Sequence, residues 1–274
     1  MGRNYLEESK LYKGYLYTEL SNDELKYLHE TTLLMFEKVI AILDKYSIRY
    51  TIIGGTLLGA VTQKGFIAWD DDIDICVFEE DYNRMQKVLI KELPGWINIQ
   101  CKETEANYFH DWIKIRDKRS EVSPKINKYR YNGVWIDIYK IEKQKAKRVQ
   151  YDNIKEHISY LCRRFKVHDI SFKEFIGRCT KRNLIPKLIK ELIILLKSSD
   201  NTEVYQIHNA SRMVLQKDWI YPLKKYKFEN IEVWGINQAE SYLISHYGGS
   251  YNANPPEEMR RISINKVKWK RSAL

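Results

Sequence analysis

The chain has 274 residues, of which 44% are hydrophobic and 30% are charged, and its formal net charge is +10. This composition predicts an ordinary globular protein, organised as one large domain or two small ones. No apolar run is long enough for a transmembrane helix, and the polar residues 1–8 do not resemble a secretory signal peptide. The four cysteines are widely spaced, which indicates reduced thiols in a cytoplasmic protein.

The positive charge is concentrated in two segments. Residues 140–200 hold 16 Lys or Arg against 7 Asp or Glu, and residues 259–274 hold 6 basic residues and no acid. Such asymmetry indicates an anionic partner, which nucleic acid, a phosphorylated substrate or an anionic membrane surface would each satisfy. A solvated basic face without a partner is the alternative.

The N-terminal half alternates between helical and strand patterns. Ser21 and Glu24 form a capping box, and apolar residues at helical spacing predict a helix over residues 22–46. A buried strand over 48–53 then enters the Gly54-Gly55 turn. The later patterns predict a short helix over 56–62, a strand over 73–78, a helix over 81–93, and strands over 96–101, 108–116 and 134–139.

The C-terminal half is expected to be mainly helical. Residues 142–200 lack strand alternation, and residues 184–197 form an apolar stretch with interspersed lysines. This stretch is either a core helix or a helix that lies in a membrane interface. One or two strands over 226–234 and a helix over 237–247 follow. The fold class is therefore α+β, with a catalytic core over 20–140 and a mainly helical basic lobe with the C-terminal segment over 141–274.

Four aspartates within five residues are the strongest indication of a functional site: Asp70, Asp71, Asp72 and Asp74. Two carboxylates about 5 Å apart repel by roughly 3 kcal/mol at an effective dielectric constant near 20, so the cluster needs a cation. Residues two apart on a strand share a face, which places Asp72 and Asp74 together. Asp137 repeats the pattern of one acid between apolar neighbours on another strand. Carboxylates that face substrate phosphates are typical Mg²⁺ ligands.

The residues from 54 to 75 carry a family resemblance. They read Gly54-Gly-Thr-Leu-Leu-Gly-Ala-Val-Thr-Gln-Lys-Gly-Phe-Ile-Ala-Trp-Asp-Asp-Asp-Ile-Asp-Ile75. This string resembles the LicD family of phosphocholine transferases, within the nucleotidyltransferase superfamily that includes DNA polymerase beta. Weaker echoes are Lys114-Ile-Arg-Asp117, Val134-Trp-Ile-Asp-Ile138, and Tyr247-Gly-Gly-Ser-Tyr251 followed by Pro255-Pro256.

The resemblance implies a polymerase-beta-like nucleotidyltransferase core and a transferase activity. It implies transfer of a phospho-alcohol, chiefly phosphocholine from CDP-choline, to a hydroxyl of a cell-surface glycan sugar, with release of CMP. The acceptor would be a lipopolysaccharide, teichoic acid or capsule precursor, and acceptors of this family are often lipid-linked. The alternatives are another CDP-linked alcohol (ribitol, glycerol or ethanolamine) and a small-molecule nucleotidyltransferase.

The site residues follow from the motifs. Asp72, Asp74 and Asp137 are the expected catalytic metal ligands for Mg²⁺ or Mn²⁺, with Asp70 as a further candidate. Asp137 would complete a second metal site or accept the proton of the acceptor hydroxyl. Candidates for binding the donor phosphates are Gly54, Gly55, Thr56, Lys64, Lys114 and Arg116. Candidates for an aromatic cage around a quaternary ammonium are Trp69, Tyr108, Trp112, Trp135 and Tyr139.

A different class remains open. The basic segments also suit a nucleic-acid-binding or membrane-binding module. Nucleic acid is the less favoured partner, because four aspartates would repel its phosphates without a metal ion. Peripheral attachment to the inner face of the cytoplasmic membrane is compatible with an enzyme.

Overall fold

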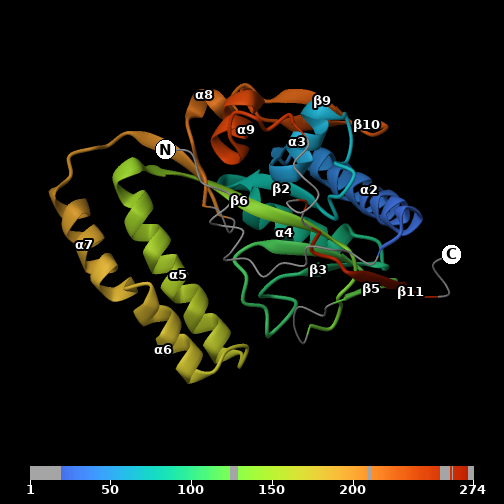
Figure 1. The fold of residues 1–274 in the computed structure, drawn as a ribbon. Coiled ribbons are helices and arrows are strands. Elements are labelled where there is room, and N and C mark those ends of the chain that lie inside the picture. The colour runs from blue at the N-terminus through green and yellow to red at the C-terminus, as the bar shows by residue number, and fades with distance from the viewer. Residues whose placement is uncertain (1–19, 124–128, 209–211, 254–259, 261, 271–274) are drawn as a thin grey trace.

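A computed structural model describes residues 20–123, 129–208, 212–253, 260 and 262–270 of the chain (Figure 1). Residues 1–8 and the Pro255-Pro256 pair, both used above, lie outside this part. The helices are α2 (Asn22–Lys45), α3 (Gly54–Thr62), α4 (Glu79–Glu92), η1 (Ala146–Arg148), α5 (Val149–Lys166), α6 (Phe172–Lys181), α7 (Leu184–Lys197), α8 (Lys217–Ile220) and α9 (Ala239–Tyr247). The strands are β1 (Tyr50–Ile52), β2 (Ile73–Phe78), β3 (Ile97–Gln100), β4 (Ile113–Asp117), β5 (Ser120–Ser123), β6 (Trp135–Lys145), β7 (Glu203–Ile207), β8 (Val214–Leu215), β9 (Lys224–Phe228), β10 (Ile231–Gly235) and β11 (Lys266–Trp269).

One mixed sheet organises the molecule. Its strand order is β3-β4-β6-β2-β1-β10-β9, with β7 and β8 continuing from the far end of β6. The pairs β2–β6 and β1–β10 are parallel, and the other pairs along the order are antiparallel. The prediction of an α+β fold is confirmed at this level: a mixed sheet with helices packed on it.

Helix α2 forms as its sequence predicts. Ser21 caps α2, because its side chain accepts the backbone N–H of Glu24 and the Glu24 carboxylate accepts the N–H of Ser21. Residues on one side of α2, including Leu28, Met35 and Val39, are buried in the main core. The predicted helices at 56–62, 81–93 and 237–247 and the strands at 73–78 and 226–234 also correspond to observed elements, with shifted ends.

Two strand predictions need correction. The strand expected over 108–116 begins only at Ile113, because Tyr108 closes a turn on Glu105 and packs with Phe109 and Tyr129 in a cluster of its own. The strand expected over 134–139 continues to Lys145, because its second half pairs with β7. Strands β5, β7, β8 and β11 were not predicted.

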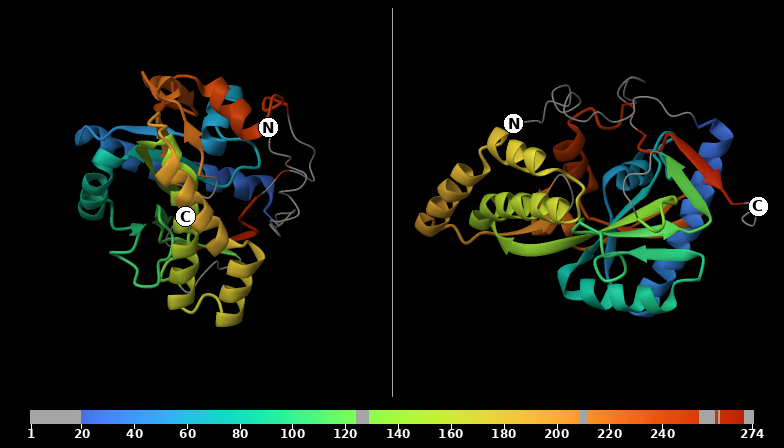
Figure 2. Two further views of the ribbon diagram at one scale, coloured as in Figure 1. Left: turned by 90° about the vertical axis from the view of Figure 1, so that its left-hand side faces the viewer. Right: turned by 90° about the horizontal axis from the view of Figure 1, so that it is seen from below.

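Helices α5, α6 and α7 form a lobe beside the sheet, which Figures 1 and 2 show projecting to one side of the molecule. The helical prediction for most of residues 142–200 is therefore confirmed. None of the helices in the described part of the chain combines the length and apolarity that crossing a bilayer requires.

Strand β6 crosses residue 140, and β9 and β10 enter the same sheet as β1. The division into a core over 20–140 and a lobe over 141–274 stays a prediction.

Candidate active site

Strand register brings one row of polar side chains together across four strands. Asp74 on β2 pairs with Asp137 on β6, Asp137 pairs with Lys114 on β4, and Lys114 pairs with Gln100 on β3. Side chains of directly paired residues lie on the same face of a sheet. The two acids and the lysine therefore meet on one face, although 63 positions of sequence numbering separate Asp74 from Asp137.

Asp137 is the most heavily hydrogen-bonded of these acids. Its two oxygens accept from Nζ of Lys114 at 2.6 and 2.7 Å. Trp112 Nε1 donates to Oδ1 at 3.1 Å, and the Tyr139 hydroxyl donates to Oδ2 at 3.3 Å. Asp137 and Lys114 are both buried. This ion pair fixes the position of the carboxylate.

Asp72 and Asp74 complete a three-carboxylate group with Asp137. One oxygen from each of the three lies within 4.8 Å of the others. Trp135 Nε1 donates to Oδ2 of Asp72 at 2.9 Å, which orients that side chain. Both carboxylates are half-buried. Three hard oxygen donors at this spacing match what a divalent cation such as Mg²⁺ accepts.

Asp70 and Asp71 differ in their surroundings. Asp71 is buried, and its Oδ2 accepts the backbone N–H of Ile264 at 2.6 Å. Asp70 is half-buried, and its backbone carbonyl lies 2.6 Å from Nε2 of His29. Oxygens of Asp70, Asp71 and Asp72 also lie within 4.8 Å of one another. Asp72 is thus shared between two acid groups, and Asp71 anchors the loop to the C-terminal segment.

Burial and mutual repulsion make this cluster costly without a cation. Burial and the neighbouring carboxylates raise the pKa of Asp72 well above its usual range. Burial, and then the Asp137 charge, raise the pKa of Asp74 to about 7. Burial, with the nearby Arg116 charge, lowers the pKa of Lys114, although Asp137 opposes this. One lysine faces three carboxylates, so the group keeps excess negative charge that a divalent metal would neutralise.

Gly54 and Gly55 lie directly against the acids. Gly54 has a φ of +58°, and a Cβ added there would lie 2.7 Å from Oδ2 of Asp74. A Cβ on Gly55 would lie closer still to Oδ2 of Asp70. The glycines therefore leave room for carboxylates at the N-terminus of α3, whose partial positive charge favours anions.

Two of the residues predicted to bind the donor phosphates, Gly54 and Thr56, form hydrogen bonds within the protein. The Gly54 N–H donates to the Tyr242 hydroxyl at 3.0 Å, and the Thr56 hydroxyl accepts the backbone N–H of Asp74 at 2.8 Å. These contacts link α3 to β2 and α9. Binding of a phosphate by Gly54, Gly55 and Thr56 stays a prediction.

Lys114 and Arg116 share a face, as the strand pattern predicts, and both cations lie over the Trp135 ring, at 4.7 and 4.9 Å from its centroid. Arg116 is fully buried and donates to Gln100 Oε1 and to the Gly133 carbonyl. Lys64 is exposed in a turn, and its backbone carbonyl accepts the N–H of Glu229. A phosphate-binding role for these three residues stays a prediction.

Tyr242, which holds the Gly54 backbone, is not among the site residues predicted from the sequence. Trp135 and Trp112 are predicted only as members of an aromatic cage, whereas both donate to the acids. The tryptophan on β6 carried a signal, because Trp135, Asp137 and Tyr139 alternate along one strand and so share a face. Tyr242 carried none, because it lies 188 residues from its partner.

Residues 47–181 match the family model described as "LicD/FKTN/FKRP, nucleotidyltransferase domain". The chain is 29% identical over 243 residues to the lipopolysaccharide cholinephosphotransferase LicD of Haemophilus influenzae, covering 80% of this chain and 87% of that protein. The chain belongs to the LicD family.

Two rickettsial proteins are also similar in sequence to this LicD-family chain. An uncharacterized protein of Rickettsia prowazekii is 28% identical over 206 residues, which is 65% of this chain and 73% of that protein. An uncharacterized protein of Rickettsia typhi is 48% identical over 48 residues, which is 18% of this chain and 16% of that protein. The matched residues 47–181 include the loop with Asp70, Asp71 and Asp72, strand β2, and strand β6 with Asp137.

Proposed function

We propose that this LicD-family protein transfers phosphocholine from CDP-choline to a sugar hydroxyl of a cell-surface glycan, with release of CMP. Family membership makes the chain a transferase of phosphorus-containing groups. The choline group and a lipopolysaccharide acceptor are supported by the name of the Haemophilus relative. The CDP-linked donor, the divalent metal and a polymerase-beta-like core are our proposals.

The convergence of Asp72, Asp74 and Asp137 carries this proposal. Three carboxylate oxygens within 4.8 Å form an oxygen-only donor set, in which Asp74 and Asp137 lie on adjacent parallel strands and Asp72 directly precedes β2. Carboxylates alone would repel the diphosphate of a nucleotide donor. A divalent ion, Mg²⁺ or Mn²⁺, supplies the positive charge that neutralises both when it is bound.

The protein's own residues hold and orient the reactants. Asp72 and Asp74 are the proposed principal ligands, with Trp135 fixing the Asp72 carboxylate. Asp137 already accepts from Lys114, Trp112 and Tyr139, so its carboxylate is held in place. One of its oxygens lies within 4.8 Å of oxygens of Asp72 and Asp74, which supports a role for Asp137 in the same metal site.

The aromatic residues beside Asp137 are the proposed contact for the choline head group. The ring centroids of Trp112 and Tyr139 lie 5.5 Å apart, and those of His110 and Trp112 lie 4.4 Å apart. Burial, reinforced by nearby Lys and Arg side chains, lowers the pKa of His110 well below its usual range, so this ring is neutral. Neutral aromatic faces attract a quaternary ammonium ion.

Donors with other alcohols remain the alternative. Ribitol, glycerol or ethanolamine would use the same acids and the same diphosphate chemistry but would gain less from aromatic faces. A small-molecule nucleotidyltransferase would instead transfer the nucleotide and release pyrophosphate. A nucleic-acid-binding module would leave the acid cluster unexplained.

A panel assay tests the proposal. The protein is incubated with CDP-choline, CDP-ethanolamine, CDP-ribitol or CDP-glycerol, with Mg²⁺, Mn²⁺ or EDTA, and with candidate glycans, and CMP is measured. We expect CMP release with CDP-choline that requires metal and is lost in Asp72→Ala, while the Asp23→Ala control on α2 is unaffected. Metal-independent release, or full activity of Asp72→Ala, would show that the site is wrongly assigned.

A further inference from the structure

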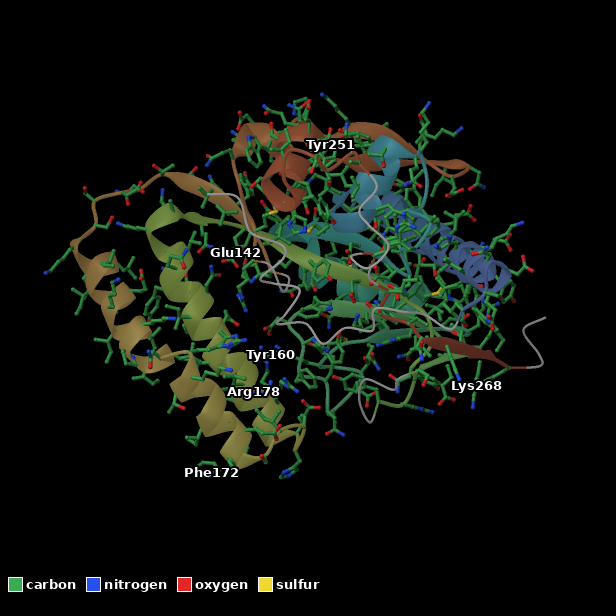
Figure 3. All side chains as sticks on the ribbon, in the orientation of Figure 1. Glu142, Tyr160, Phe172, Arg178, Tyr251 and Lys268 are labelled. Carbon is green, nitrogen blue, oxygen red and sulfur yellow. The ribbon has the colours of Figure 1, made fainter. Side chains whose placement is uncertain are left out.

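The lobe formed by α5, α6 and α7 has an apolar surface that the rest of the chain does not cover. Of the twelve exposed large hydrophobic side chains in the described residues, eight lie on α6 and α7. They are Phe172, Ile176, Ile185, Ile189, Leu192, Ile193, Ile194 and Leu196. Figure 3 shows Phe172 at the tip of this lobe. We call this set the lobe face.

Helix α7 has a wide apolar face, and only one side of the helix is covered. Leu184 is buried against Leu161 and Ile170, where α7 packs along α5. On the opposite side Ile189 is 55% exposed and Leu196 is 77% exposed. The apolar face of an amphipathic helix normally packs against protein or lipid. A groove of ≈ 520 Å³ runs along the exposed side, lined by Ile185, Pro186, Ile189, Lys190, Ile193 and Ile194.

The segment that carries the lobe face is also strongly basic. Residues 172–197 hold seven Lys or Arg and two Glu, so their net charge is +5 (seven minus two). Lys187, Lys190 and Lys197 lie on α7 itself, and Lys190 lines the groove. Two copies joined through this face would bring +5 against +5, which disfavours self-association.

Aliphatic side chains with lysines between them fit a lipid surface better than a protein partner. Protein interfaces are enriched in aromatic residues and depleted in lysine. Helices that lie in a bilayer interface combine an apolar side with Lys or Arg that contact anionic head groups. We propose that the lobe face binds the surface of an anionic bilayer, with α7 lying in the interface.

This inference goes beyond the transfer reaction and does not depend on it, because binding to vesicles requires neither donor nor metal. A chain bound in this way has its acid cluster beside a membrane surface, where lipid-linked acceptors would be concentrated.

Co-sedimentation of the full chain with vesicles tests the inference. The vesicles contain phosphatidylcholine alone or a mixture with phosphatidylglycerol, at low and high salt. We expect binding to the mixed vesicles that weakens in high salt and is weak with phosphatidylcholine alone. Ile189→Asp should weaken the partition about tenfold, since it removes a large apolar side chain from the interface.

Matched variants distinguish vesicle binding through the lobe face from nonspecific binding elsewhere on the protein. Ile90→Asp, at a position 47% exposed on α4, is the apolar control and should bind as the unmodified chain does. Lys187→Glu combined with Lys190→Glu should weaken binding about tenfold or more, whereas Lys26→Glu on α2 should not. Melting curves check that each variant is folded. Leu196→Ser, at the most exposed position of α7, repeats the test with a milder change.

Three results would overturn the inference. The first is no binding to anionic vesicles, and the second is equal binding by Ile189→Asp, Leu196→Ser and the unmodified chain. The third is a dimer in sedimentation velocity that Ile189→Asp dissociates, which would assign the lobe face to a second copy.

Discussion

Replacing Asp74 by Asn should stabilise the metal-free protein while removing its function. In the folded chain, burial and neighbouring charge raise the pKa of Asp74 from 3.8 to about 7. A rise of roughly three units corresponds to about 4 kcal/mol of unfavourable free energy once the carboxyl is ionised. Asn keeps the size and one oxygen, and the backbone bonds of Asp74 to Thr56 and Ile53 are unaffected.

The magnitude is reduced by relaxation of the neighbouring carboxylates, which stay charged in the variant. We therefore expect Asp74→Asn to gain about 2 kcal/mol in EDTA at pH 8, or about 4–8 °C in melting temperature. Adding Mg²⁺ should stabilise the unmodified chain by preferential binding and the variant much less.

The sign of the pH dependence provides an independent check. Below pH 3.8 the carboxyl is protonated in both states. Between pH 3.8 and about 7 the unfolded chain releases the proton while the folded chain retains it, so stability falls as pH rises. Above about pH 7 this contribution is constant. Asp74→Asn should flatten the slope in that window.

Thermal unfolding from pH 4 to 8, in EDTA and in Mg²⁺, measures these effects. Asp117→Asn is the control, because this buried acid is paired with the Arg119 side chain and backbone N–H. It should lose stability instead. If Asp74→Asn melts below the unmodified chain in EDTA at pH 8, the electrostatic reasoning about the cluster is wrong.

Three further outcomes follow from the site. Lys114→Met leaves the buried Asp137 without its cation and should cost about 3 kcal/mol in chemical denaturation, more than Lys118→Met at an exposed amine. Gly54→Ala places a Cβ against Asp74 at a left-handed φ, so we expect a loss of more than about 1 kcal/mol, whereas Gly95→Ala, with open space around the added Cβ, should be nearly neutral in the same assay. Trp135→Phe removes the donor to Asp72 and should weaken Mg²⁺ binding roughly tenfold in calorimetry, with unchanged affinity as the refuting result.

The fold near the acids could be predicted because its signals are local. The Ser21 capping box, the Gly54-Gly55 turn and the alternation around Asp72 and Asp74 each lie within a few residues. Strand alternation also placed Lys114 and Arg116 on one face. The extra strands could not be predicted, because β7 and β11 are short and pair with β6 and β5, which are distant in sequence.

The partners of the site residues were the harder part. Lys114 was expected to meet a phosphate, but the register of β4 against β6 places its amine on Asp137. Register between strands that are distant in sequence depends on packing of the whole sheet, which no local pattern reports. The same holds for Tyr242 on Gly54 and for Ile264 on Asp71.

The bond from Ile264 to Asp71 has a consequence for biosynthesis. The loop that carries Asp70, Asp71 and Asp72 is translated early, but its anchor is translated 193 residues later. Until then the Asp71 carboxylate of the emerging chain lacks the Ile264 N–H donor and lies beside acids that repel it. A ribosome-bound intermediate that ends before residue 264 should therefore hold this loop open, and the site would be assembled only as the last strand, β11, leaves the exit tunnel.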